Sequence, residues 1–181
     1  KHELNYLRFD YFGHGQSSGD FLKGTISAWR KEVANILSKL TDGPVVLVGS
    51  SFGGWLSTMM ATQFPDKIVG LVLIAPAVDM TERLMWNEFD ADMRKALMED
   101  GIVYTPSDYD DQGYPITRDL IEDGRSHLML DNAIAFDGPV RFLHGQQDMA
   151  VPWKLSLEIA EKLTSTDVDI HFVKNGDHSL S

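Results

Sequence analysis

Ser51, a serine that could act as a nucleophile, lies between Gly49 and Gly53, directly after an apolar run and before a segment of helical spacing. This G-x-S-x-G pattern in a strand–turn–helix context is typical of a nucleophile elbow, in which a sharp turn exposes the serine hydroxyl. Glycines are expected there because the strand and the helix approach each other closely. For the pentapeptide alone, a glycine-rich connection that merely ends a strand is the alternative.

A serine hydroxyl is a poor nucleophile until a neutral imidazole accepts its proton, and a carboxylate must hold that imidazole in the correct tautomer. Asp148 and His178 could supply these groups, because they follow predicted strands at 140–143 and 168–173. The carboxyl ends of parallel strands share one edge of a sheet, so the loops beyond them can meet. We therefore predict Ser51 as nucleophile, Asp148 as orienting carboxylate and His178 as base.

Other side chains compete for these roles. Asp79 follows another predicted strand end, from which a carboxylate could reach the same histidine, so it remains an alternative to Asp148. Asp177 adjoins the base but points elsewhere if His178 faces the serine. The remaining histidines, which we expect to be structural or which have no motif around them, are His2, His14, His127, His144 and His171.

The elements that must position these residues alternate between strands and helices, which predicts an α/β fold with a doubly wound, mostly parallel sheet. The predicted strands are 4–10, 45–48, 68–74, 140–143 and 168–173. Helices are expected from an N-cap at Thr25, after Ser51, and over 152–163. The strand at 68–74 is apolar without alternation, as expected of a strand covered by helices on both faces.

Between about 80 and 137 the regular alternation stops, and the stretch is longer than a connection requires. We expect an inserted helical lid within a single domain that spans residues 1–181. Adaptable thioethers and aromatic rings suited to an apolar pocket occur there, namely Met80, Met85, Trp86, Phe89, Met93, Met98, Tyr104, Tyr109 and Tyr114. The alternative is that they only pack the lid on the core.

Composition bounds the class of protein. The 181 residues, 43% of them hydrophobic, suit one domain, and a formal net charge of -11 disfavours nucleic-acid and anionic-lipid partners. There is no cysteine, so thiol nucleophiles and thiolate metal sites are excluded. The longest apolar stretch, 68–78, is too short to span a bilayer and no signal segment opens the chain, so we expect a soluble, cytoplasmic protein.

Cofactor and metal motifs are weak. The sequence has no dinucleotide or P-loop pattern, and we expect no cofactor. The stretch 108–113, with Asp119, approximates the ligand spacing of a calcium loop, but Gln112 and Asp119 replace the usual fifth and twelfth ligands. An acidic, solvated turn is the preferred interpretation, and we expect no metal.

Several motifs together resemble the α/β-hydrolase superfamily over essentially the whole chain. They are the loop 9–17, the elbow 49–54, the acid loop 144–152 and the histidine loop 176–178. The resemblance implies that the backbone amide of Phe52 forms half of an oxyanion hole and that an earlier loop supplies the other amide. The elbow, 101–106, 151–153 and 165–169 are most similar to a subfamily of palmitoyl-protein thioesterases that also cleave acyl glucuronides, and to bacterial relatives.

That earlier loop has no counterpart here, because Lys1 stands where the family's fourth strand would begin, and the family's last helix after His178 is also missing. We expect that the natural protein is longer, that a neighbouring chain completes the sheet, or that activity is reduced; loss of one oxyanion donor typically costs about 10²–10³ in turnover. An exposed sheet edge would invite homo-oligomerisation by strand pairing.

The sequence thus predicts a serine hydrolase that acts on a small-molecule ester or thioester with an apolar acyl group, through an acyl-enzyme on Ser51. Two alternatives stay open. One is a hydrolase-like scaffold that binds an acyl ligand or a protein without turnover, and the other is a peptidase of the same fold.

Overall fold

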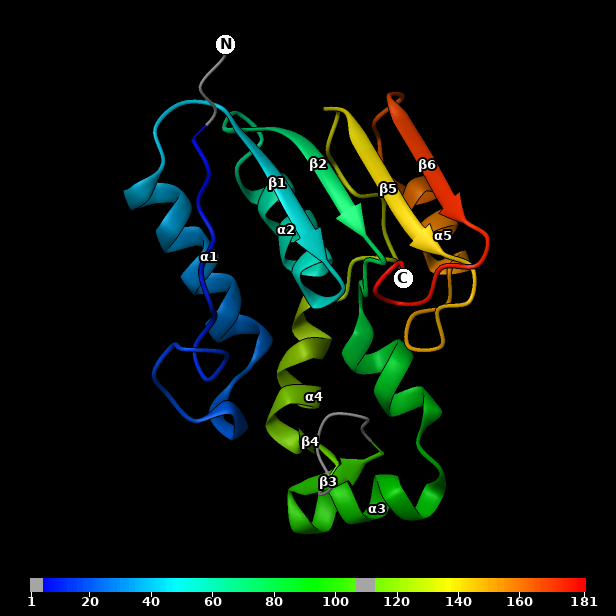
Figure 1. The fold of residues 1–181 in the computed structure, drawn as a ribbon. Coiled ribbons are helices and arrows are strands. Elements are labelled where there is room, and N and C mark those ends of the chain that lie inside the picture. The colour runs from blue at the N-terminus through cyan, green and yellow to red at the C-terminus, as the bar shows by residue number, and fades with distance from the viewer. Residues whose placement is uncertain (1–4, 107–112) are drawn as a thin grey trace.

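A parallel sheet forms the centre of the computed structural model, which describes residues 5–106 and 113–181 (Figure 1). Its strand order is β1-β2-β5-β6, and all neighbouring pairs are parallel. The strands are β1 Val45–Ser50, β2 Ile68–Ile74, β5 Val140–Gly145 and β6 Val168–Val173. The predicted α/β fold is confirmed, and the carboxyl ends of the strands lie at one edge of the sheet.

Three helices share the main apolar core with this sheet: α1 Ile26–Leu40, α2 Phe52–Gln63 and α5 Lys154–Lys162. The predicted cap at Thr25 is confirmed, because its hydroxyl oxygen accepts a hydrogen bond from the Ala28 amide at 3.2 Å. Helices α2 and α5 lie behind the sheet in Figure 1. Their apolar side chains, including Trp55 and Ile159, join Leu73 and Phe142 of the sheet in the main core.

The opposite face of the sheet is less covered than the apolar run of β2 predicts. On β1, Val46 and Val48 are 56% and 63% exposed. The register pairs Val48 with Val72, which is half-buried, so these side chains share one face. The difference arises because α2 and α5 both pack against the other face.

The strand predicted at 4–10 is wrong over the residues described, since 5–10 form no strand. An extended segment becomes a strand only when a neighbour completes its hydrogen bonds. Here Asp10 bonds within its own loop instead: its carboxylate accepts from the Gln16 amide at 3.0 Å, and its carbonyl oxygen accepts from the Ser17 hydroxyl at 2.6 Å. These contacts close the glycine-rich loop and precede the short helix η1 Phe21–Lys23.

Between β2 and β5 the chain forms a separate helical excursion with a small hairpin, at the bottom of Figure 1. Its elements are the π-helical turn η2 Thr81–Met85, η3 Trp86–Glu88, α3 Ala91–Asp100, antiparallel β3 Ile102–Thr105 and β4 Tyr114–Thr117, α4 Arg118–Gly124 and η4 Arg125–His127. A second apolar cluster holds it together: Phe89, Leu97, Val103, Ile116 and Ile121.

The apolar residues singled out in this excursion divide between packing and exposure. Phe89 and Met80 are buried at 7% and 8% exposure, whereas Tyr104 is 49% exposed. The ring of Trp86 makes cation–π contacts with two guanidinium groups, those of Arg94 and Arg125, which lie 5.3 and 4.7 Å from the ring centroid. Tyr109 and the near-match to a calcium loop over 108–112 lie outside the described residues. Within the described ranges, no helix is long and apolar enough to cross a membrane.

Candidate active site

Ser51 lies in the sharp turn between β1 and α2 with φ 50° and ψ −120°. This conformation is rare for a residue with a side chain, and it directs the chain from the strand straight into the helix. The turn is fastened to its neighbours, because the Ser51 amide donates to the Ile74 carbonyl at 2.8 Å and the Ala77 amide donates to the Ser51 carbonyl at 3.0 Å. The elbow geometry predicted from the sequence is therefore present.

The glycines around Ser51 are not equivalent. A Cβ on Gly49 would come within 2.3 Å of the Gly53 carbonyl oxygen, and one on Gly54 within 2.7 Å of Pro76. At Gly53 the nearest atom, the Tyr11 hydroxyl oxygen, would be 3.6 Å away. Close approach therefore requires glycine at 49 and 54, whereas the motif singled out 49 and 53.

Phe52 is the first residue of α2, so its amide is among those that have no partner within the helix. Such an amide can donate to an oxygen that gains negative charge. The Phe52 ring is held by edge-on contacts with Tyr11 and Trp29, whose centroids are 5.7 and 5.0 Å away. The sequence-predicted oxyanion donor thus sits on a firmly packed residue.

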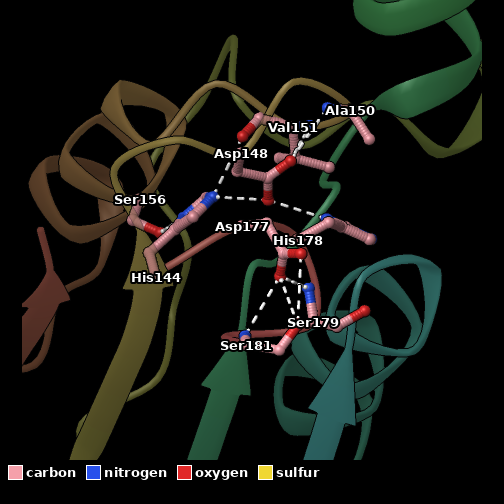
Figure 2. Close-up of polar contacts among 9 residues, drawn as sticks. All are labelled: His144, Asp148, Ala150, Val151, Ser156, Asp177, His178, Ser179 and Ser181. Carbon is pink, nitrogen blue, oxygen red and sulfur yellow. Dashed lines mark hydrogen bonds and ion pairs between the residues drawn. The ribbon is translucent and has the colours of Figure 1, made fainter. Parts of the chain in front are cut away.

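The loops after β5 and β6 bring Asp148 and His178 together, as Figure 2 shows. Nδ1 of His178 lies 2.7 Å from Oδ2 of Asp148, whose side chain is fully buried at 0% exposure, while that of His178 is 35% exposed. The other oxygen, Oδ1, accepts from the amides of Ala150 at 2.9 Å and Val151 at 2.8 Å. A buried, well-bonded carboxylate therefore contacts an imidazole that remains accessible.

Sequence reasoning set His144 aside as structural, but its imidazole also contacts Asp148. Nε2 of His144 lies 3.2 Å from Asp148 Oδ2, and Nδ1 lies 2.8 Å from the Ser156 hydroxyl oxygen. The sequence signal that could have found it is the spacing of His144 and Asp148 across the tight turn 145–147, which lets the two side chains face each other.

Asp79, the alternative acid, has different partners. Its oxygens accept from the backbone amides of Met129 and Leu130, each at 2.9 Å, and the carboxylate that contacts His178 is that of Asp148. Burial raises the pKa of Asp79 above its ordinary value, although these two hydrogen bonds act in the opposite direction.

Asp177 points away from the imidazole of its neighbour. Its carboxylate accepts from the amides of Ser181 at 3.1 Å and Ser179 at 2.8 Å, and these bonds lower its pKa. Of the other histidines, His127 contacts the Ser27 hydroxyl oxygen at 2.7 Å, and His14 packs edge-on against Phe21 with centroids 5.1 Å apart.

The hydrogen bonds of the described residues join His178 to Asp148 but do not join His178 to Ser51. In Figure 1 the C-terminal segment runs back across the carboxyl ends of the strands. Catalytic hydrogen bonds in a free enzyme are often long and tighten only when substrate binds. The same described ranges contain no cluster of three or more His, Asp or Glu residues that could hold a metal ion.

A family model described as "Alpha/beta hydrolase family" matches residues 1–181. The chain belongs to the alpha/beta hydrolase family. The predicted resemblance to this family is thereby confirmed.

Relatives within the alpha/beta hydrolase family include the mitochondrial palmitoyl-protein thioesterase ABHD10 of Bos taurus, which is 40% identical over 178 residues, covering 97% of this chain and 57% of the relative. The chain therefore spans little more than half the length of this relative. The mouse alpha/beta hydrolase domain-containing protein 10 has a solved structure that matches with a TM-score of 0.86 and 38% identity, over 95% of this chain and 69% of that one. A crystal structure from Agrobacterium vitis S4 matches with a TM-score of 0.90 and 37% identity, over 95% and 68%.

Proposed function

We propose that this alpha/beta hydrolase cleaves carboxylic esters or acyl thioesters through an acyl-enzyme on Ser51. The observation that carries the proposal is the 2.7 Å contact between buried Asp148 and half-exposed His178, on the loops beyond β5 and β6. An imidazole that donates Nδ1–H to a carboxylate keeps its Nε2 lone pair free for a hydroxyl proton.

In the proposed reaction the Ser51 oxygen attacks the substrate carbonyl while Nε2 of His178 accepts the hydroxyl proton. The Phe52 amide donates to the oxygen that becomes negative in the tetrahedral intermediate. Asp148 stays ionised and stabilises the imidazolium ion of His178. The imidazolium then gives its proton to the leaving alcohol or thiol as the bond to the acyl carbon breaks.

Water completes the proposed cycle. His178 takes a proton from the attacking water, the hydroxide oxygen bonds to the acyl carbon, and the Ser51 oxygen leaves with the proton returned by His178. The products are a carboxylic acid and the regenerated serine. Each step uses groups of this chain and water, so the proposal requires no cofactor.

A thioester with a long apolar acyl group is the substrate we propose first, because the Bos taurus relative is named a palmitoyl-protein thioesterase. We propose that the excursion between β2 and β5 acts as a lid over the acyl group, which its exposed Met98 and Tyr104 could contact. Location in the cytoplasm stays a prediction, and this relative is named as mitochondrial.

Labelling with a fluorophosphonate tests the nucleophile. We expect the wild type to be labelled, Ser51→Ala to be unlabelled, and Ser50→Ala, which changes the neighbouring serine, to be labelled normally. An unlabelled wild type, or labelling that persists in Ser51→Ala, contradicts the proposal.

A substrate panel tests the bond that is cleaved. One acyl group is presented as p-nitrophenyl ester, thioester and amide, and then the acyl group is varied from acetyl to palmitoyl. We expect a burst of acyl-enzyme and turnover with the ester and thioester that increases with acyl length. Saturable fatty-acid binding without a burst would favour a non-catalytic scaffold, and preferential cleavage of the amide would favour a peptidase.

A further inference from the structure

His144 lies near the end of β5 with its imidazole completely buried, at 0% exposure. Nε2 is 3.2 Å from Asp148 Oδ2 and 3.0 Å from the carbonyl oxygen of Val151, and Nδ1 is 2.8 Å from the Ser156 hydroxyl oxygen. Every polar atom of the ring therefore has a partner, and one partner is the carboxylate oxygen that also contacts His178 (Figure 2).

The partners settle which ring nitrogen carries the proton. A carboxylate and a carbonyl oxygen can only accept, so Nε2 must be the donor toward Asp148 and Val151. Nδ1 is then free to accept from Ser156, whose hydroxyl can rotate to donate. Ser156 lies on α5, so this helix supplies the hydrogen-bond partner of Nδ1, while the two acceptors at Nε2 set the tautomer.

We infer that His144 is a positioning residue for the Asp148–His178 pair, an inference that rests on the proposed function. The amides of Ala150 and Val151 hold Oδ1 of Asp148, and His144 holds Oδ2. With donors on both oxygens, the carboxylate cannot rotate without breaking hydrogen bonds in a buried site. His178 therefore meets a carboxylate whose orientation is already fixed by groups other than itself.

The same nitrogen also fastens the loop itself. By donating to both the Asp148 carboxylate and the Val151 carbonyl oxygen, His144 joins the two ends of the turn 148–151 to the end of β5. The turn is joined a second time by the Val151 amide, which donates to Asp148 at 2.8 Å. A fixed loop of this kind places the carboxylate that orients His178 with the accuracy that proton transfer needs.

The variants that test this role are His144→Leu, which fills similar space without a donor, and His144→Gln, whose amide N–H can still donate toward Asp148. Ser156→Ala removes the partner of Nδ1 and leaves the Nε2 donor in place. His171→Gln is the matched control, because His171 is an exposed histidine on β6.

Two readouts are measured at a temperature at which every variant is folded by circular dichroism. The first is kcat and KM with the p-nitrophenyl ester, and the second is the proton NMR resonance of His178 Nδ1–H. We expect His144→Leu to lower kcat by roughly 10–100-fold, the range known for groups that orient metal-binding side chains, with KM little changed and the resonance shifted. His144→Gln should recover most of kcat, Ser156→Ala should lose less than His144→Leu, and His171→Gln should match the wild type.

Wild-type kcat together with an unmoved resonance in His144→Leu would overturn the inference. Equal losses in His144→Leu and His144→Gln would also overturn it, because packing rather than the donated hydrogen bond would then matter. The proposed function fails separately: a wild type without Ser51-dependent turnover contradicts it, while the His178 resonance in the His144 variants still decides whether His144 orients the pair.

Discussion

Asp79 follows β2 and Asp148 follows β5, the neighbouring strand, and both residues are almost fully buried, at 3% and 7% exposure. Their donors differ. Asp79 accepts from backbone amides, whereas Asp148 also contacts the imidazoles of His144 and His178. Both carboxylates thus lie beyond a strand end. The hydrogen-bond donors that other elements supply, backbone amides for Asp79 and imidazoles for Asp148, distinguish a structural carboxylate from the proposed catalytic one.

The donors to Asp79 come from Met129 and Leu130, at the far end of the excursion that begins immediately after Asp79. Asp79 therefore ties the outgoing and returning stems of this excursion together. We call this contact the stem clamp: Asp79 with Met129 and Leu130. Its counterpart is Asp148 in the acid loop 144–152, whose partly exposed partner His178 is the proposed base.

The largest expected effect is a difference in kcat between substitutions of the two carboxylates. Asp148→Asn should lower kcat by about 10⁴, equivalent to about 5.5 kcal/mol, because an amide favours the wrong tautomer of His178. Asp79→Asn should change kcat by less than about tenfold, since its oxygens bind backbone amides rather than an imidazole. Steady-state ester hydrolysis measures both, and a loss in Asp79→Asn as large as that in Asp148→Asn would reverse the assignment.

The next effect concerns stability. Asp79→Ala should reduce the free energy of unfolding by about 1–3 kcal/mol for the buried Leu130 amide alone, because that donor loses its acceptor. Asp79→Asn keeps one acceptor oxygen and should lose less. Urea unfolding measures both variants, and equal stability of Asp79→Ala and wild type would show that the stem clamp does not stabilise the fold.

A smaller effect is the pH dependence of the stem clamp. Because burial raises the pKa of Asp79 above 3.8, the folded state holds more protons than the unfolded chain in the window above 3.8. The free energy of unfolding should therefore fall as pH rises through this window. Urea unfolding as a function of pH should show this fall for the wild type relative to Asp79→Asn. The same dependence of the free energy of unfolding on pH in both proteins would contradict the prediction.

His127, close to the stem clamp in sequence, should act in the opposite direction. Burial lowers its pKa below 6.5, more strongly than the nearby Asp123 raises it, and the charge of Arg30 adds to the lowering. The folded state then binds fewer protons, so stability should decrease as pH falls below 6.5 toward the folded pKa. His127→Gln should remove this slope in the same urea series, and an unchanged slope would show that another group titrates.

Local sequence patterns correctly predicted the elements that depend mainly on interactions between residues close together in the sequence. The helix from Thr25 has its cap and apolar spacing within its own residues, and α1 follows them. The segment 5–10 has the composition of a strand, but a strand also needs a neighbour, which is decided by distant parts of the chain. The exposed valines of β1 have the same origin, because an apolar run does not reveal which face the helices cover.

The candidate site shows the same limit at the level of side chains. The loops carrying Ser51, Asp148 and His178 could be ordered along the sequence because each follows a strand of one parallel sheet. The partners of Asp79 lie about 50 residues away, and no spacing connects them. The spacing of His144 and Asp148 places both residues at one turn, but it does not reveal that His144 contacts the same carboxylate oxygen as His178.

The backbone of Ser51, at φ 50° and ψ −120°, has the conformation of the first central residue (i+1) of a type II′ turn. Glycine adopts this conformation without steric cost. Glycine has no hydroxyl, so the residue that best suits the turn is not the one that can attack a carbonyl. Under the proposed mechanism, activity and thermostability therefore set opposite requirements at position 51. A directed-evolution screen that scores heat resistance alone should accept glycine at 51 and return a more stable protein without the proposed nucleophile.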